Sequence, residues 1–210
     1  MQRIGLLLSG CGRYDGTEIH EAVLALLALD RRGARVDFLA PSAARAELVD
    51  HGTGQLVEGE FRSVLTESAR LSRGRIQPAR EARVSLLAAL IVPGGQGVVR
   101  AIMQGVGETG RRREADPEVA ELIRGFVEAR RPVGTISLAG SLVATVLGLP
   151  LDEDPFSVPP FEIRVDEERG LVWTPGYLTG DRISEVATGI DRMVEAVLAR
   201  ASGGLAMAPP

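Results

Sequence analysis

A serine and a glutamate stand where an α/β protein could bring a nucleophile and a proton-transfer group together. Ser137 lies in the stretch Gly134-Thr-Ile-Ser-Leu-Ala-Gly140, which carries the chain from a predicted strand sharply into a helix. A hydroxyl on such a turn projects into the crevice beyond the sheet, in a geometry that resembles a nucleophile elbow. Glu21 lies one turn into an early helix and could accept or donate the proton, with Glu18 as the alternative carboxylate.

Backbone amides close to these side chains could hold an oxyanion. The turn Pro93-Gly-Gly-Gln-Gly97 presents bare amides to the edge of the sheet. We expect the amide of Gly95 to act together with that of Leu138, the residue after the serine, and Gly94 to face the same pocket. A carboxylate buried next to these amides would have a raised pKa.

Each candidate also has a simpler interpretation. Ser137 could be only the small side chain that a crowded turn demands, because a serine nucleophile normally needs an adjacent histidine. The two histidines, His20 and His51, both precede the turn in the chain, so no triad is visible. Glu21 could be a solvated carboxylate favoured by the helix dipole. Cys11 follows the first predicted strand at the same edge and could be a substitute nucleophile if the loop lowers its pKa.

The sequence predicts neither a metal site nor a cofactor. His20 has no second ligand at helical spacing, so we interpret it as a surface or capping residue. The glycines at positions 94, 95 and 97 lack the full pattern of a dinucleotide-binding loop, and a tight turn explains them. The chain contains no lysine, which excludes a Schiff-base lysine, a pyridoxal phosphate attachment and a P-loop.

Alternating strands and helices must position these residues. Apolar runs predict strands at residues 3–9, 35–40 and 88–92 and from 133 onward. Helical patterns cover residues 18–32, 61–73, 98–104, 116–130, 138–148 and 181–200, and the segments 161–165 and 171–174 predict an antiparallel hairpin. The first 40 residues form a βαβ unit, which sets a parallel sheet. In a doubly wound topology the turns at 9–17, 93–97 and 137–140 converge at one edge.

Length and charge narrow the class of protein. The 210 residues fit one compact α/β domain over residues 1–200, with a flexible tail at 201–210. A net charge of −4 without a basic footprint argues against nucleic-acid or anionic-membrane partners, and the basic run 111–113 is typical of a solvated loop. The single cysteine rules out an intramolecular disulfide. Together with the lack of a signal-peptide pattern or a membrane-spanning run, it leads us to expect a soluble, cytoplasmic protein.

Four segments resemble a known family. They are SGCGRYDGTEIHEAVLALLALDRRG, ALIVPGGQG, PVGTISLAG and the C-terminal TPGY with ISEVATGIDRMVEAVL. Together they look like the ElbB-type glyoxalase family, also called enhancing lycopene biosynthesis protein. That family lies within the superfamily of PfpI-like proteins and class I glutamine amidotransferase-like domains. The resemblance implies a flavodoxin-like, mostly parallel sheet with helices on both faces, a homodimer and cofactor-free conversion of glyoxal to glycolate. It also implies an elbow cysteine bonded to a glutamate of the first helix.

The chain departs from this pattern at the elbow, where Ser137 stands at the position of the family's cysteine. The family also carries a cysteine at the position of Cys11, so we favour a structural role for that residue. The segment 149–160 is shorter than its counterpart in the family. We expect either glyoxalase-like lyase or hydrolase-type chemistry on a small carbonyl, or a catalytically silent protein that binds a small metabolite or serves as a scaffold. A third possibility is that Glu21 activates water directly while Ser137 only hydrogen-bonds.

Overall fold

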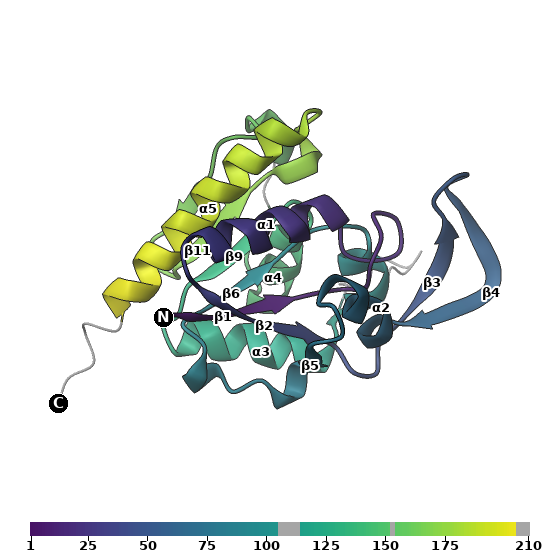
Figure 1. The fold of residues 1–210 in the computed structure, drawn as a ribbon, viewed down its shortest axis with the longest axis horizontal. Helices are drawn as coiled ribbons and strands as arrows, with labels where there is room; N and C mark the ends of the chain where they lie inside the picture. The colour runs from purple at the N-terminus through teal and green to yellow at the C-terminus, as the bar shows by residue number, and fades with distance from the viewer. Residues whose placement is uncertain (105–113, 152–153, 205–210) are drawn as a thin grey trace.

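The protein is built around one seven-stranded sheet with helices on both faces (Figure 1). The computed structural model describes residues 1–104, 114–151 and 154–204. In sheet order the strands are β10 (Arg164–Asp166), β11 (Leu171–Thr174), β9 (Val133–Ile136), β6 (Ala89–Val92), β1 (Arg3–Leu7), β2 (Arg35–Ala40) and β5 (Ile76–Pro78). Only the pair β10–β11 is antiparallel. The predicted flavodoxin-like α/β class, with a C-terminal hairpin, is confirmed.

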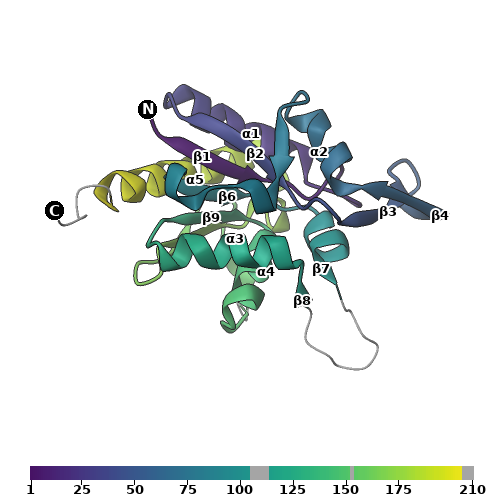
Figure 2. The same cartoon turned by 90° about the horizontal axis from the view of Figure 1, so that it is seen from below.

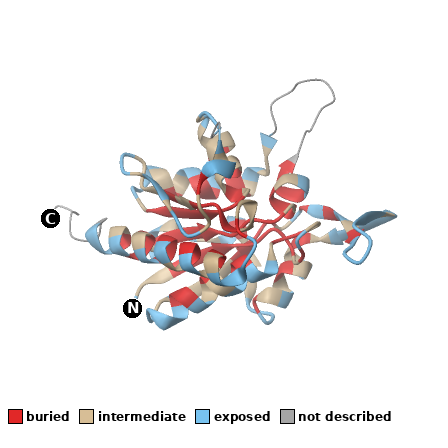
Figure 3. Ribbon diagram, turned by 90° about the horizontal axis from the view of Figure 1, so that it is seen from above, coloured by how far each residue is buried: buried red, intermediate tan, exposed pale blue. Residues whose placement is uncertain are grey.

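Apolar runs place the central strands in the interior. Every residue of β6 and β9 is buried, as are four of the five residues of β1. Strands that are covered on both faces need apolar side chains on both faces, which is why these runs do not alternate with polar residues. Figure 3 shows the buried residues concentrated in these strands and on the inward sides of the helices.

Two layers of helices cover the sheet (Figure 2). Helices α1 (Ile19–Arg31) and α5 (Ile183–Gly204) share one apolar cluster with one face. Helices α3 (Pro117–Glu128) and α4 (Ala139–Leu147) pack on the other. Helix α5 extends past residue 200, where we expected the domain to end; the rest of the expected tail, 205–210, lies outside the described residues. None of the described helices has the length and apolar character needed to cross a membrane.

The region between β2 and β5 differs from the sequence prediction. A hairpin of β3 (Arg45–Asp50) and β4 (Gln55–Ser63) projects from the body in Figure 1, and α2 (Val64–Leu71) follows it. The predicted helix over 61–73 is therefore wrong for its first three residues. They pair with residues 45–47, a contact that helical periodicity cannot reveal. The Ser63 hydroxyl then caps α2 by accepting a hydrogen bond from the amide of Thr66.

Two further predictions are corrected by long-range hydrogen bonds. The segment 98–104 forms a π-helical turn, η3 (Val98–Ile102), and then β7 (Met103–Gln104), because β7 pairs with β8 (Glu114–Ala115). The predicted strand 161–165 begins only at Arg164, since the carbonyls of 161 and 162 accept side-chain hydrogen bonds instead. The short 3-10 turns are η1 (Ala79–Glu81), η2 (Val84–Leu86), η4 (Pro155–Ser157) and η5 (Gly176–Leu178). The basic run 111–113 lies outside the described residues.

The three strand-to-helix turns meet at one edge of the sheet, as predicted. The amide of Gly97 donates to the carbonyl of Gly16 at 2.9 Å, and the amide of Glu18 donates to the carbonyl of Gly94 at 2.9 Å. The third turn, at Ser137, lies against Gly94: a Cβ added to that glycine would fall 2.7 Å from the serine Cβ. The doubly wound topology therefore assembles a site from segments far apart in the chain.

Replacing Gly97 by alanine tests how tightly these turns are packed. A Cβ at Gly97 would lie 2.5 Å from both the Cα of Gly16 and the carbonyl oxygen of Ser9, which are backbone atoms that cannot rotate away. We expect Gly97→Ala to lower the free energy of unfolding by about 1–3 kcal/mol in urea titrations. In Gly203→Ala, where a Cβ meets nothing within 4 Å, we expect stability to be unchanged or slightly higher. Equal stability of the two variants would show that the turns are not in close contact.

Candidate active site

Ser137 occupies a strained elbow between β9 and α4. Its φ angle is 56°, in the left-handed region that costs a residue with a side chain about 1–2 kcal/mol. The turn is held from both sides, because the amide of Ser137 donates to the carbonyl of Thr174 at 2.9 Å and its carbonyl accepts from Nε1 of Trp173 at 3.0 Å. The side chain is 7% exposed. Such strain persists where the surrounding structure enforces it, which is typical of functional sites.

Glu21 is fully buried and is held by two backbone amides. Its Oε2 accepts from the amide of Gly94 at 2.8 Å, and its Oε1 accepts from the amide of Tyr177 at 3.0 Å. The interpretation of Glu21 as a solvated first-turn carboxylate is therefore wrong. One carboxyl group links α1, the turn after β6 and the segment after β11.

Glu21 and Ser137 are neighbours across Gly94. A Cβ at Gly94 would lie 2.7 Å from Oε2 of Glu21 and equally close to the Cβ of Ser137, so only glycine leaves room for both side chains. Among the described residues, no hydrogen bond joins the glutamate carboxyl to the serine hydroxyl, and neither histidine bonds to Ser137. The structure thus brings together the two residues that we predicted from the sequence as a candidate pair.

Burial changes the protonation of Glu21. Desolvation, together with the nearby charge of Glu18, raises the pKa of its carboxyl, and the hydrogen bonds from Tyr177 and Gly94 partly offset the rise, so that the pKa is about 8. At neutral pH the neutral form therefore predominates. A neutral carboxyl can donate a hydrogen bond or a proton, whereas the ionised minority can accept one.

The backbone amides near the predicted oxyanion site differ in whether they already donate a hydrogen bond. In the part of the chain that the structure describes, the amides of Gly95 and Leu138 have no hydrogen-bond partner; Gly95 is buried, whereas Leu138 is partly exposed. The amide of Gly94 is already occupied by Glu21. Glu18 is also engaged, since its carboxylate caps α1 by accepting from the amide of Glu21 at 2.7 Å. Its role is therefore helix capping and an electrostatic influence on Glu21.

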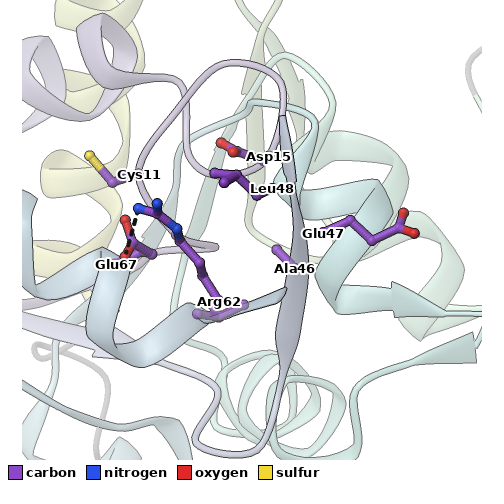
Figure 4. A pocket seen from close by; sticks show the side chains of 9 residues that line it. Cys11, Asp15, Ala46, Glu47, Leu48, Arg62 and Glu67 are labelled. Atoms are coloured by element: carbon purple, nitrogen blue, oxygen red, sulfur yellow. Dashed lines mark ion pairs between the residues drawn. The ribbon is translucent and has the colours of Figure 1, made fainter. Parts of the chain in front are cut away.

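Cys11 lines a separate small cavity. Figure 4 shows it beside Glu67, which forms an ion pair with Arg62, and with Asp15 across the cavity. The volume is about 10 Å³, enough for roughly one water molecule. Burial, and then the charge of Glu67, raise the pKa of the Cys11 thiol, which disfavours the reactive thiolate. These contacts support the structural role that we expected for Cys11.

Sequence reasoning missed the contribution of Tyr177. Its amide holds Glu21, and its hydroxyl lies 3.0 Å from Nδ1 of the exposed His20. The preceding Gly176 has a φ of 53°, and a Cβ there would fall 2.4 Å from Oε1 of Glu21. The sequence signal that could have indicated it is the Pro-Gly-Tyr turn directly after a strand.

Among the described residues, no three His, Cys, Asp or Glu side chains gather as they would to hold a metal ion.

Comparisons with known proteins identify the family. No family model matches the chain. Glutamine amidotransferase-like class 1 domain-containing protein 3, mitochondrial, from Homo sapiens is 34% identical over 93% of this chain and 82% of its own length. ES1 protein homolog, mitochondrial, from Rattus norvegicus is 32% identical over 93% of this chain and 83% of its own length. The chain belongs to the ES1 family of class 1 glutamine amidotransferase-like proteins.

Solved structures agree with this assignment. The ES1-family chain superposes with a TM-score of 0.82 on an isoprenoid biosynthesis protein with an amidotransferase-like domain from Ehrlichia chaffeensis. The two chains are 28% identical, and the superposition covers 99% of that structure and 94% of this chain. Oxidized DJ-1 from Toxoplasma gondii, 14% identical with a TM-score of 0.50 over 98% of both chains, shares the fold alone. The family and superfamily recognised in the sequence are confirmed.

The expected cytoplasmic location is contradicted. The relatives from human and rat are both named as mitochondrial proteins. The expectation rested partly on a single cysteine, which excludes an intramolecular disulfide but does not distinguish between compartments in which thiols stay reduced.

The raised pKa of Glu21 predicts a pH dependence of stability. Below its ordinary value of 4.5, folded and unfolded chains both keep the proton; between 4.5 and about 8, only the folded protein keeps it. The free energy of unfolding should therefore fall as pH rises through this window, by on the order of a few kcal/mol. Glu21→Gln should remove this decline, whereas Glu121→Gln, on the exposed face of α3, should retain it. Chemical denaturation from pH 4 to pH 9 measures the slopes, and equal slopes in all three proteins would contradict burial of Glu21.

The strained elbow predicts that glycine stabilises the protein at one serine and not at another. Ser137→Gly relieves the positive φ and should raise the free energy of unfolding by up to about 1 kcal/mol. Ser141→Gly, inside α4, removes a hydroxyl that donates to the carbonyl of Leu138 at 2.7 Å and should be destabilising. Urea titrations of both variants measure the difference. Destabilisation of both would mean that the elbow is not strained.

Proposed function

We propose that this ES1-family protein converts small reactive carbonyl compounds, of which glyoxal is the simplest, without a cofactor. The observation that carries the proposal is the fully buried Glu21 with a pKa of about 8, placed across Gly94 from a strained Ser137. A pKa near the working pH lets one carboxyl both take and return a proton. The free amides of Gly95 and Leu138 supply hydrogen-bond donors for a carbonyl oxygen.

The chemistry balances with water as the only co-reactant. Oγ of Ser137 adds to one carbonyl carbon of glyoxal as Glu21, in its ionised form, takes the hydroxyl proton. The new oxyanion rests on the two amides until Glu21 returns the proton and a hemiacetal forms. Glu21 then takes the C–H proton of that carbon to give an enediol, and protonation of the neighbouring carbon yields a glycolate ester on the serine. Water hydrolyses the ester to glycolate and restores Ser137, so one carbon is oxidised and the other is reduced.

A second candidate function is binding without turnover. It is favoured by the hydrogen bonds of Glu21, which come from two backbone amides and, among the described residues, not from the Ser137 hydroxyl. A serine hydroxyl is far less acidic than a thiol, so it needs a base in contact with it. A catalytically silent member of the family would keep the pocket for a small metabolite. In both cases we propose a homodimer, which sedimentation tests directly.

The first experiment compares glyoxal consumption and glycolate formation in matched variants under reducing conditions. All proteins carry Cys11→Ser, so that no native thiol contributes. We expect slow turnover with Ser137, turnover at least tenfold faster in Ser137→Cys, because the thiolate is the better nucleophile, and a loss of at least 100-fold in Glu21→Gln.

Ser141→Cys is the matched control, because it places a thiol beside the elbow, one turn further along α4, and leaves Ser137 in place. It should show only the rate of the Ser137 protein. Turnover in Ser137→Cys alone would support the silent binding protein, with a pocket that has lost its nucleophile. The absence of glyoxal consumption in every variant would refute the carbonyl chemistry.

A further inference from the structure

A large cavity opens on the α4 side of Ser137. Its volume is about 630 Å³, within the range of pockets that hold small organic molecules. Ser137 and Leu138 are among the residues that line it, so the elbow is part of the cavity wall. Glu21 does not line it, although its Oε2 and the Cβ of Ser137 both lie 2.7 Å from the point where a Cβ on Gly94 would fall. A ligand in this cavity would therefore meet the serine hydroxyl first.

The walls of the cavity are mostly apolar. The sheet contributes Leu171 and Trp173, α4 contributes Val143 and Ala144, and the segment after α4 contributes Phe156. The Phe156 side chain is 69% exposed, so an apolar ring faces solvent at the wall of the cavity. Covering that ring with an apolar ligand would remove apolar surface from water and so favour binding.

Contacts on several sides hold the Trp173 side chain, which forms part of the cavity wall. Nε1 of Trp173 donates to the carbonyl of Ser137, and the Arg164 guanidinium lies 5.6 Å from the centroid of its ring. A Cβ at Gly140 would lie 2.7 Å from the indole Cδ1, so the ring rests against the first turn of α4. The cavity wall and the elbow are thus coupled through one side chain.

Most of the polar groups in the cavity already have partners. The hydroxyl of Ser141 donates to the carbonyl of Leu138 at 2.7 Å, and Asp166 pairs with Arg169 at 2.9 Å. In the described part of the chain, the unbonded polar groups at the elbow are the Ser137 hydroxyl and the Leu138 amide. A fitting ligand has one polar end and an apolar body.

We infer that the site takes carbonyl compounds with an apolar substituent the size of a phenyl or branched alkyl group. This inference rests on the proposed function and narrows its substrate class. Glyoxal has only four heavy atoms and would leave most of the cavity filled with water against apolar walls. A carbonyl placed at Ser137 with an apolar body along Trp173 would use the unbonded polar groups and the apolar walls together.

Trp173 allows a direct test, because it is the protein's single tryptophan and lines the cavity. The probes are phenylacetone and acetone, which share a ketone and differ in the phenyl group. Titration of the intact protein with phenylacetone should give a saturable change in tryptophan fluorescence, with a Kd at least tenfold lower than that for acetone. The measurement needs no turnover.

Cavity-filling variants make the test specific to this site. Ala144→Phe should raise the Kd for phenylacetone at least tenfold, and Ala144→Leu, a smaller change that folds more readily, should raise it less. Ala187→Phe is the matched control, because Ala187 is also a half-buried alanine on a helix but lines the groove between α1 and α5. It should leave the Kd unchanged.

Several outcomes would overturn the inference. They are no fluorescence change with phenylacetone, equal Kd values for the two ketones, an effect of Ala187→Phe as large as that of Ala144→Phe, or a tryptophan signal that depends on protein concentration alone because a second copy covers the cavity. Binding of phenylacetone without conversion of any aldehyde would support the cavity and refute the proposed activity. Conversion of glyoxal without binding of phenylacetone would support the proposed activity and refute the inference about the cavity.

Discussion

The architecture of the site depends on keeping one carboxyl group out of water. Desolvating a carboxylate is costly, and an isolated charge in the interior shifts its pKa until the neutral form dominates. Glu21 follows this rule, and its two oxygens are satisfied by amides from segments that lie more than eighty positions apart in the sequence, at Gly94 and Tyr177. Because each amide must reach its oxygen, the buried carboxyl fixes the relative position of α1, the β6 turn and the segment after β11.

Glycines are the complementary requirement. At both Gly94 and Gly176 an added Cβ would fall within 2.7 Å of a Glu21 oxygen. The backbone can donate to the carboxyl only because no side chain separates them. The same space lets the glutamate approach Ser137, so the geometry that satisfies the carboxyl also sets the distance over which it can exchange a proton with the elbow.

The sequence predicts the central layers well because their information is local. The apolar runs of β1, β6 and β9 are buried by any fold that covers both faces of a sheet. Asp116 indicates the start of α3, because its side chain caps that helix. The hairpin of β3 and β4 could not be predicted in the same way, because β4 is largely exposed and the two strands are defined by their pairing with each other. Periodicity reports which side faces the core and is silent where little is buried.

The candidate site was predictable up to the point where long-range contacts decide it. Ser137 and Glu21 could be chosen because a strand-to-helix turn and a first-turn carboxylate are local features. The partner amide of Tyr177 comes from the other end of the chain, and Gly94 was expected to face a ligand although it faces Glu21. Residue type alone does not show which of several free amides a buried carboxyl will take.

Trp173 connects the strained elbow to the cavity beside it. Its indole N–H donates to the carbonyl of Ser137, which also accepts a hydrogen bond from the amide of Gly140 at 3.3 Å. The same ring forms the wall along which an apolar ligand would lie. A ligand that shifts the indole would therefore alter the hydrogen bond that holds the serine backbone at its positive φ. A ligand lying along Trp173 would therefore act on the backbone of the elbow as well as on the wall of the cavity, because one side chain contributes to both.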